Sequence, residues 1–377
     1  MIQINFFSDA ESSSIYPLNT GRCISSLHFG GRAIATQWEE ALSSTNFSDI
    51  SLNSRLLPTL DSIETVWLLK EGQAWKKDGV ILAERKSIKE LEDLPSKTTP
   101  LLLNSPLDIF ELCGHGIEED LQRVKRAWST RTLNEDERTA WALSGVIVHG
   151  DIEKIHVAPG VKIRSCTLNT EDGDIVLGPD SEIMEGTNVR GPLMLGAFST
   201  IKMGSQIYGP TTIGAHCKVG GEISNSVIHD YSNNAHGGFL GNSVLGSWCN
   251  LGAGTSCSNL KNTYGEIGVW DEKKKSIEKS GRIFCGLLMG DHSKTAINTS
   301  FNTGTVVGAF CNVFGIETPE KHVPSFTWGG GGDAEEHKMK KALETAKKVM
   351  LRRGVEMDST EEDLIKSLFE ATSSDRG

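Results

Sequence analysis

The sequence lacks the features that mark several common classes of protein. Its 377 residues carry a formal net charge of -11, so there is no excess of positive charge to form a general nucleic-acid surface. The eight cysteines contain no C-x-x-C pair, and we interpret them as small buried residues of a reducing compartment. No stretch reaches membrane-spanning length, and no basic region precedes the first apolar residues. These absences predict a cytoplasmic protein that binds neither nucleic acid nor membrane.

Glycine, in contrast, is abundant at 40 residues, and the middle of the chain repeats with a period of six. Helices repeat near 3.6 and strands near 2, so this period fits neither element alone. It predicts a hexapeptide β-solenoid, in which each six-residue rung gives a short strand and a corner. Such a prism has flat outer faces and no internal cavity, so ligands must bind outside it or between subunits. The aliphatic positions of the repeat are Leu177, Ile183, Val189, Leu195, Ile201, Ile207, Ile213 and Val219.

The composition divides the chain into three zones. Residues 1–140 mix short apolar segments, I-Q-I-N-F-F and T-V-W-L-L-K, with helical patterns over Ile34–Leu42 and Leu107–Val124. These patterns predict an α/β or α+β domain whose strands include both apolar segments. Residues 145–330 carry the solenoid.

Two segments interrupt or follow the repeat. The charged run Trp270–Arg282 carries no rung, and we expect it to form a loop that leaves the prism. Residues 334–377 have helical periodicity and predict two helices, the second starting near Ser359 with Glu362 completing a capping box.

A histidine lies where the six-residue phase is lost. His236 follows the break after Val219, between Asn234 and two glycines. A histidine in a corner can point into a cleft and accept a proton near neutral pH. The alternative is a surface or hydrogen-bonded structural histidine, and spacing alone favours that alternative.

The motifs around this histidine resemble those of a known family. A-H-x-x-x-L-G followed by N-L-G-A-G-T is similar to the acetyltransferase domain of the bifunctional enzyme that makes UDP-N-acetylglucosamine. The longer motifs S-N-L-K-N, F-C-G-L-L-M-G-D-H-S-K, F-N-T-G-T-V-V-G and P-S-F-T-W-G-G resemble the GlmU-related sugar nucleotidyltransferase/acetyltransferases of Bacteroidetes and similar bacteria. The resemblance implies a left-handed parallel β-helix, a homotrimer, acetyl-CoA as co-substrate and an N-terminal nucleotidyltransferase-like domain.

The resemblance also implies roles for individual residues. His236 matches the catalytic base that deprotonates the amino group of glucosamine-1-phosphate. Asn259 matches an asparagine that holds the sugar and the reacting centre, and Asn250 matches a second asparagine on the sugar side. Ala253 matches a backbone contact to acetyl-CoA, and we expect Thr303 on the coenzyme side as well.

The sequence departs from the family pattern in its phosphate contacts. Phe239 replaces a substrate-binding tyrosine, and Ser224 replaces the lysine that binds the sugar phosphate. The phosphate therefore needs another cation, and Arg190 and Lys202 are the candidates in the repeat.

Two further groups of polar residues permit more than one interpretation. G-D-H-S-K, Gly290 to Lys294, is either a site for phosphate or coenzyme A, or a corner held by hydrogen bonds. His216, His229 and His236 are thirteen and seven residues apart. The zinc sites of solenoids that resemble γ-class carbonic anhydrase require a close histidine pair, so we predict no metal site.

The N-terminal zone lacks the glycine-rich L-x-x-G-x-G-T-R loop that holds a triphosphate. We expect a shortened nucleotidyltransferase-like domain, with UTP and Mg²⁺ as ligands only if it is active. The sequence thus predicts an N-acetyltransferase acting on an amino-sugar phosphate, with nucleotidyl transfer as a second activity. The alternative is a non-catalytic nucleotide-sugar-binding or assembly module.

Overall fold

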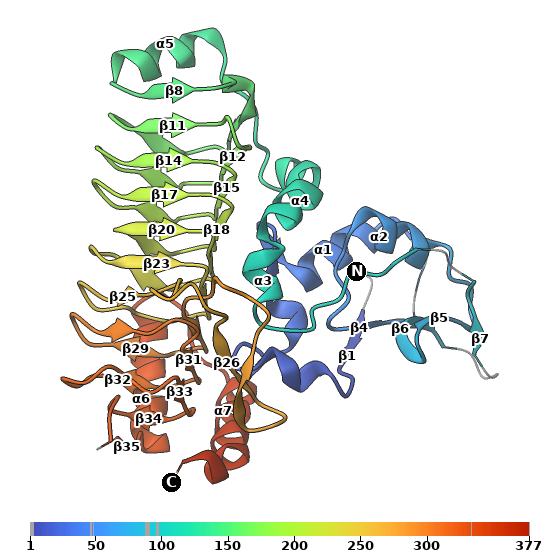
Figure 1. Ribbon diagram of the computed structural model, residues 1–377. Coiled ribbons are helices and arrows are strands. Elements are labelled where there is room, and N and C mark those ends of the chain that lie inside the picture. Colours follow the sequence, from blue (N-terminus) through green and yellow to red (C-terminus); the bar gives the residue numbers. More distant parts are fainter. Residues whose placement is uncertain are drawn as a thin grey trace.

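The computed structural model describes residues 4–45, 47, 49–86, 91–95, 98–332 and 334–376. A long solenoid forms the body of the molecule, an α/β part packs against one side of it, and two helices lie beside its C-terminal end (Figure 1). Within the described residues, no helix has both the length and the apolar character that crossing a membrane requires.

The solenoid has three parallel sheets, which we call the front, covered and rear sheets. The front sheet contains β8 (Ile147–His149), β11 (Thr167–Asn169), β14 (Asn188–Arg190), β17 (Gln206–Tyr208), β20 (Glu222–Ser224) and β23 (Phe239–Gly241), and the pair β25 (Ser256–Cys257) and β30 (Ser300–Phe301) follows below. The covered sheet contains β9 (Ile155–Val157), β12 (Ile175–Leu177), β15 (Leu193–Leu195), β18 (Thr211–Ile213), β21 (Val227–Ile228), β24 (Val244–Leu245), β28 (Leu288–Met289), β31 (Val306–Val307) and β33 (His322–Val323).

The rear sheet contains β10 (Lys162–Ile163), β13 (Glu182–Ile183), β16 (Thr200–Ile201), β19 (Lys218–Val219) and β22 (Asn233–Asn234), and it is extended below by β29 (Lys294–Thr295), β32 (Asn312–Val313), β34 (Thr327–Trp328) and the antiparallel β35 (Glu335–Glu336). The chain visits the front, covered and rear sheets in turn, and the coil winds in a left-handed sense (Figure 1). This architecture confirms the predicted parallel β-helix.

The six-residue period corresponds to inward side chains that stack from coil to coil. Ile183, Ile201 and Val219 are in register in the rear sheet and are almost fully buried. The next partner of Val219 is Asn234, so this coil has 15 residues where the preceding one has 18. The loss of the six-residue phase therefore reflects shorter corners. The parallel pairing of strands continues across this break.

The N-terminal part is a small mixed sheet flanked by helices. Its strands lie in the order β1 (Asn5–Phe7), β4 (Ile50–Asn53), β6 (Val80–Arg85), β5 (Gln73–Lys77) and β7 (Glu92–Asp93), and β2 (His28–Phe29) pairs with β3 (Arg32–Ala33) apart from them. Its helices are α1 (Ile34–Leu42), α2 (Leu60–Trp67), α3 (Asp108–Glu111) and α4 (Cys113–Ala127), and α5 (Glu135–Leu143) lies at the upper end of the solenoid.

The structure corrects parts of the sequence interpretation in this zone. The predicted strand T-V-W-L-L-K is wrong, because its first residues belong to α2. Thr59 caps this helix by accepting a hydrogen bond from the Ser62 N–H, and Ile63 and Val66 are buried three residues apart on one helix face. The predicted helix over Leu107–Val124 is divided into α3 and α4. The predicted first strand is β1, and its residues Ile2 and Gln3 lie outside the described part of the chain.

The N-terminal part covers one face of the prism. Outward side chains of the covered sheet, including Val176, Met194 and Val227, share a single apolar core with α1, α2 and α4. A cluster of hydrogen bonds fixes the contact, because the buried Nε2 of His229 accepts from the His28 N–H at 3.1 Å. The front and rear faces are left for other contacts.

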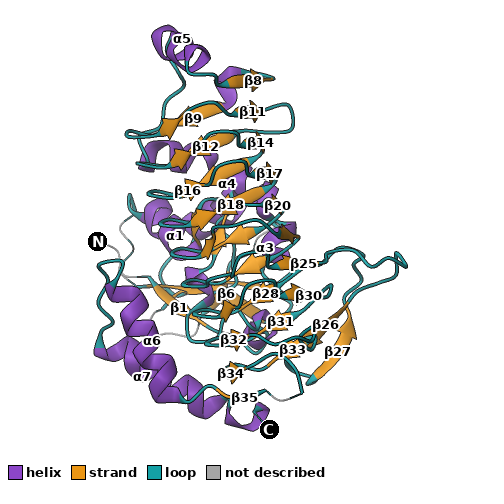
Figure 2. Ribbon diagram, turned by 90° about the vertical axis from the view of Figure 1, so that its left-hand side faces the viewer, coloured by secondary structure: helices purple, strands orange, loops and turns teal. Residues whose placement is uncertain are grey.

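The C-terminal helices α6 (Met339–Leu351) and α7 (Ser359–Ala371) lie alongside the lower coils (Figure 2). The predicted capping box of Ser359 and Glu362 is wrong, because Asp358 is the N-cap and its side chain accepts a hydrogen bond from the Glu361 N–H. The predicted loop over Trp270–Arg282 contains an antiparallel hairpin, β26 (Gly268–Asp271) and β27 (Ser276–Lys279). As predicted, this segment leaves the prism (Figure 2).

Candidate active site on the solenoid

His236 lies at the corner where the chain passes from the rear sheet to the front sheet, between β22 and β23. Its side chain is exposed and has no hydrogen-bond or ion-pair partner within the described part of the chain. Gly238 makes this corner possible, because a Cβ there would lie 2.0 Å from the carbonyl oxygen of Thr255, at a φ of 148°. The imidazole is thus free to meet a ligand.

The next coil places two more of the expected residues beside this corner. The Gly254 N–H donates to the Gly237 carbonyl at 2.8 Å, which stacks the Ala253 corner directly against the His236 corner. The N–H of Ala253 has no protein acceptor among the described residues. Asn250 is exposed on the rear face and bridges in register to Asn233, which shares β22 with Asn234.

Phe239 and Asn259 lie on the front face and converge over Gly241. A Cβ at Gly241 would lie 2.6 Å from Cζ of Phe239 and 2.7 Å from Nδ2 of Asn259. Asn242 accepts a hydrogen bond from Asn259 Nδ2 at 2.7 Å. With the amide so oriented, Oδ1 of Asn259 is left to accept a hydrogen bond from a ligand. No local sequence pattern marks Asn242, since its partner is seventeen residues away.

The two candidate cations lie above the corner. Arg190 occupies the same front-face column as Tyr208, Ser224 and Gly241, three strand spacings or about 14 Å above Gly241. Its guanidinium is paired with Asp172 and, at 3.5 Å, with Glu171.

Lys202 follows β16 at the same edge as His236 but two coils higher, about 10 Å away along the prism. Thr303 lies below, at the edge between the front and covered sheets, and is only 6% exposed. The structure therefore brings Asn250 and Ala253 close to His236, and Phe239 close to Asn259. It does not bring Arg190 or Thr303 to the His236 corner.

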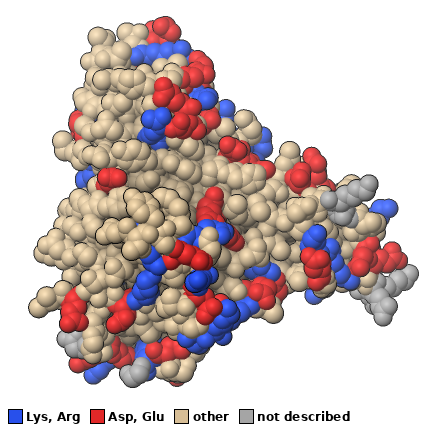
Figure 3. All heavy atoms as spheres, in the orientation of Figure 1, with Lys and Arg blue, Asp and Glu red and all other residues tan. Residues whose placement is uncertain are grey.

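The front face below Tyr208 offers few charges of its own. Ser224, at the position of the missing lysine, is one strand from Gly241. The outward residues of the neighbouring strands are mostly uncharged, and Figure 3 shows few charged side chains over the middle of this face. Within the described residues, the in-register neighbours of Ser224 on this face are Tyr208 and Gly241, and neither carries a positive charge.

The segment G-D-H-S-K is divided among three environments. Asp291 forms a 3.0 Å ion pair with Arg22 and accepts a hydrogen bond from the Ser247 N–H, which fits the corner-stabilising alternative. His292 stacks between the rings of Trp248 and Phe310. Lys294 lies on the rear face in register with Asn250.

A separate polar cluster lies at the carboxyl ends of the parallel strands β1 and β4. Asp9 pairs with Arg55 at 2.5 Å and accepts from Asn53 Nδ2 at 2.9 Å. Arg55 is only 2% exposed, and this guanidinium and the amide hold the pKa of Asp9 down to about 2 although burial opposes them. Ligands of open α/β sheets bind at such strand ends.

These residues do not fit a Mg²⁺ ion. Both oxygens of Asp9 already accept hydrogen bonds from Arg55. No group of three or more His, Cys, Asp or Glu side chains that could hold a metal is found among the described residues.

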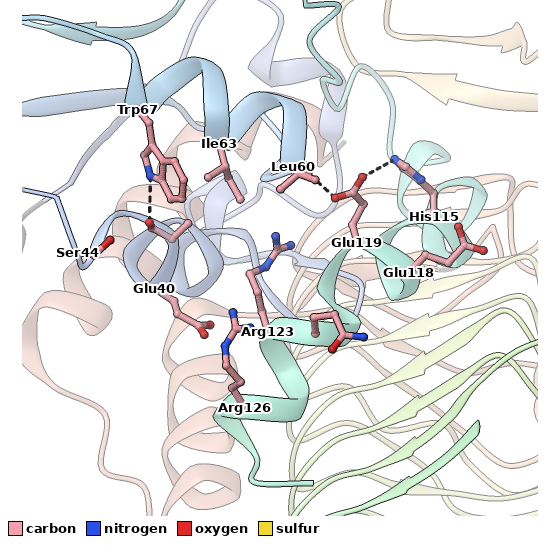
Figure 4. A pocket seen from close by; sticks show the side chains of 12 residues that line it. Glu40, Ser44, Leu60, Ile63, Trp67, His115, Glu118, Glu119, Arg123 and Arg126 are labelled. Carbon is pink, nitrogen blue, oxygen red and sulfur yellow. Dashed lines mark hydrogen bonds and ion pairs between the residues drawn. The ribbon is translucent and has the colours of Figure 1, made fainter. Parts of the chain in front are cut away.

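The N-terminal helices also form an open pocket of about 650 Å³ between α1, α2 and α4 (Figure 4). Trp67, Ile63 and Leu60 form its apolar side, and Arg123 and Arg126 project from α4. All of its lining residues belong to the N-terminal part, so it is separate from the His236 corner.

Fold and site together define a hexapeptide-repeat solenoid with an exposed histidine at one of its corners. No family model matches the chain. A bifunctional sugar-1-phosphate nucleotidylyltransferase/acetyltransferase of Sulfurisphaera tokodaii is 31% identical over 193 residues, which are 51% of this chain and 44% of that protein. The bifunctional protein GlmU of Methanococcus aeolicus is 34% identical over 90 residues, 23% of this chain and 21% of GlmU.

Part of the chain is thus similar in sequence to these bifunctional enzymes, and the chain spans less than half the length of the curated relatives it matches. Among solved structures, the polysialic acid-specific acetyltransferase NeuO aligns with a TM-score of 0.29 and 11% identity, over 51% of this chain and 85% of NeuO. An N-acyltransferase of Bacillus cereus, AntD, aligns with a TM-score of 0.24 and 10% identity, over 59% of this chain and 99% of AntD.

Proposed function

We propose that the protein is an N-acetyltransferase that moves an acetyl group from acetyl-CoA to the amine of an amino-sugar phosphate such as glucosamine-1-phosphate. One observation carries the proposal: an exposed, unpaired His236 stands at a solenoid corner, with Asn250 and Ala253 in the coil below. The Sulfurisphaera relative, whose name includes acetyltransferase, supports the same chemistry.

In the proposed reaction, each of these groups has a task. The sugar amine attacks the thioester carbonyl, a C–N bond forms and the C–S bond breaks. His236 takes the proton from the attacking nitrogen, and coenzyme A leaves as the thiolate, which is then protonated. The unpaired N–H of Ala253 can donate to the carbonyl oxygen as it gains negative charge. The free Oδ1 of Asn259 can accept a hydrogen bond from the sugar.

The first test compares acetyl transfer by the parent protein and by His236→Ala. Removing a general base lowers the rate by roughly 10²–10⁴-fold, so we expect kcat to fall by that factor. His149→Ala is the matched control, because His149 is another exposed histidine of the solenoid, at the end of β8. Equal rates for His236→Ala and the parent would contradict the assignment of His236 as the general base.

A second candidate activity is sugar-1-phosphate nucleotidyl transfer by the N-terminal part. The name of the Sulfurisphaera relative and the polar cluster at the ends of β1 and β4 favour it. The absence of a triphosphate loop argues against it. Incubation with UTP and N-acetylglucosamine-1-phosphate tests this activity. Release of pyrophosphate would support nucleotidyl transfer, and no release would exclude it.

A non-catalytic nucleotide-sugar-binding module is the alternative from another class. Ser224 and Phe239, which replace family contacts, favour it. Thermal shift separates the two, because a ligand that binds only the folded protein raises its melting temperature. Stabilisation by UDP-N-acetylglucosamine but not by acetyl-CoA would support the module and argue against the transferase.

We also propose that three copies assemble around the His236 edge. Met203 and Ile297 lie at the same edge of the prism as His236 and are 67% and 69% exposed. Large exposed apolar side chains next to a candidate site favour contact with a second chain. Light scattering of the parent and of Met203→Glu/Ile297→Glu tests the assembly, which should dissociate in the double variant and persist in Lys162→Glu.

A further inference from the structure

The rear face holds a column of polar side chains that leads past the His236 corner. Lys218, Asn233, Asn250 and Lys294 occupy consecutive positions in register and extend over about 14 Å. Each precedes an inward residue on its own strand, so all four emerge on the outer side of the sheet.

A third cation reaches this column from the C-terminal part. Arg353, just beyond the end of α6, donates from Nη2 to Oδ1 of Asn233 at 3.0 Å. Two asparagine amides therefore lie among two lysines and one arginine. We call Lys218, Asn233, Asn250, Lys294 and Arg353 the rear patch.

None of the three cations of the rear patch has a carboxylate partner within the described part of the chain. Lys294 donates only to the carbonyl of His292, at 2.8 Å, and no ion pair includes Lys218 or Arg353. The nearest acidic residue in the column is Glu182, two strands above Lys218. Asp230, on the neighbouring corner, is committed to His28 at 3.4 Å.

These cations lack acidic partners although the chain has more acidic than basic residues, with a net charge of -11. Burial lowers the pKa of Lys294, so its ammonium lacks the counter-charge that would offset its desolvation. An anion between Lys218 and Arg353 would accept hydrogen bonds from both and bring that counter-charge to the same face.

We propose that the rear patch binds a phosphate monoester, and that it takes over the task of the lysine lost at Ser224. Lys218 and Arg353 face the phosphate from two sides, Lys294 provides the charge below, and the amides of Asn233 and Asn250 contact the sugar hydroxyls. Asn250 and the His236 corner lie in adjacent coils, so the phosphate group and the reacting amine belong to one acceptor molecule. In this respect the inference rests on the proposed acetyl transfer.

The experiment measures binding and turnover in the full-length chain. The variants are Lys218→Met and Arg353→Met, with Lys162→Met as the matched control, since Lys162 projects from the same sheet three strands above Lys218. Binding of inorganic phosphate is followed by ³¹P line broadening, and acetyl transfer is measured with glucosamine-1-phosphate and with glucosamine. Melting temperatures show that each variant folds.

We expect each patch variant to weaken phosphate binding about tenfold, because a charge-assisted hydrogen bond is lost. KM for glucosamine-1-phosphate should rise by a similar factor with kcat little changed, and KM for glucosamine should stay constant. Equal phosphate binding by the parent, Lys218→Met and Arg353→Met would overturn the rear patch. If the parent binds phosphate at the patch but transfers no acetyl group, the rear patch stands and the proposed function fails.

Discussion

At the scale of single residues, the candidate site depends on two glycines that leave room for neighbouring groups. Gly238 lets the His236 corner lie against the carbonyl of Thr255, and Gly241 leaves room for Phe239 and the Asn259 amide. The chemistry of the site therefore depends on residues that carry no functional group.

The two neighbouring glycines of the corner should respond differently to alanine. Gly238→Ala places a Cβ 2.0 Å from Thr255 oxygen at a φ of 148°, so we expect a loss of at least about 2 kcal/mol of unfolding free energy. Gly237→Ala meets no atom within 4 Å and should change that energy by less than about 0.5 kcal/mol. Urea titrations of the two variants give the comparison, and equal losses would contradict the geometry.

Asn242 offers a second test, since it has a φ of 47° and holds the Asn259 amide. Asn242→Gly keeps the backbone conformation and removes the hydrogen bond. We expect acetyl transfer to fall about tenfold through a higher KM for the acceptor, while Asn242→Asp, which keeps an acceptor oxygen, retains most of the affinity. An unchanged KM in Asn242→Gly would show that the Asn259 amide does not need this support.

At the scale of elements, the corners of the solenoid stack as regularly as its strands. Seven rings form a column at the edge between the covered and rear sheets, with neighbouring centroids 4.0 to 6.0 Å apart and planes within 12°. They are Phe198, His216, Tyr231, Trp248, His292, Phe310 and Phe326, and all have positive φ. Exposure falls from 53% at Phe198 to none at Phe326, where Phe369 of α7 caps the column.

This gradient predicts unequal contributions to stability. Phe326→Ala removes a fully buried ring and should cost about 3–5 kcal/mol of unfolding free energy. Phe198→Ala removes the exposed end of the column and should cost less than about 1 kcal/mol. Chemical denaturation of both variants measures the difference, and similar costs would mean that the column does not stabilise the lower coils through burial.

The period of six was enough to predict the prism, because its inward side chains must repeat with each rung. The same periodicity could not distinguish a strand from a helix in T-V-W-L-L-K, where packing of Ile63 and Val66 and the Thr59 cap decide for the helix. The rear patch was out of reach for a related reason: Arg353 lies 120 residues from Asn233 in sequence, and no local pattern records that contact.

At the scale of the whole molecule, a buried histidine of the solenoid connects it to the N-terminal part. His229 donates from Nδ1 to the Leu245 carbonyl and accepts at Nε2 from the His28 N–H, so a proton has no place on this ring. Burial lowers the pKa of His229 well below its usual range and that of His292 to about 3.

These shifts predict stability that is lost on the acid side. The folded pKa of His292 lies below the unfolded value near 6.5, so the unfolded chain binds the proton first as the pH falls. The contribution of each such histidine to the unfolding free energy is fully present above about pH 6.5. It declines towards pH 3, by up to about 1.4 kcal/mol per pH unit. His292→Phe keeps an aromatic ring in the column but removes one titrating group. The slope of unfolding free energy against pH should therefore be smaller by the contribution of one histidine. An unchanged slope between pH 6.5 and 4.5 would contradict the assignment.

The central claim is that acetyl transfer takes place at the His236 corner. A crystal structure of the full chain soaked with acetyl-CoA tests it most directly. The account predicts density for the thioester beside His236, with its carbonyl oxygen within hydrogen-bonding distance of the Ala253 N–H. Ordered acetyl-CoA elsewhere on the molecule, with the His236 corner empty, would contradict it.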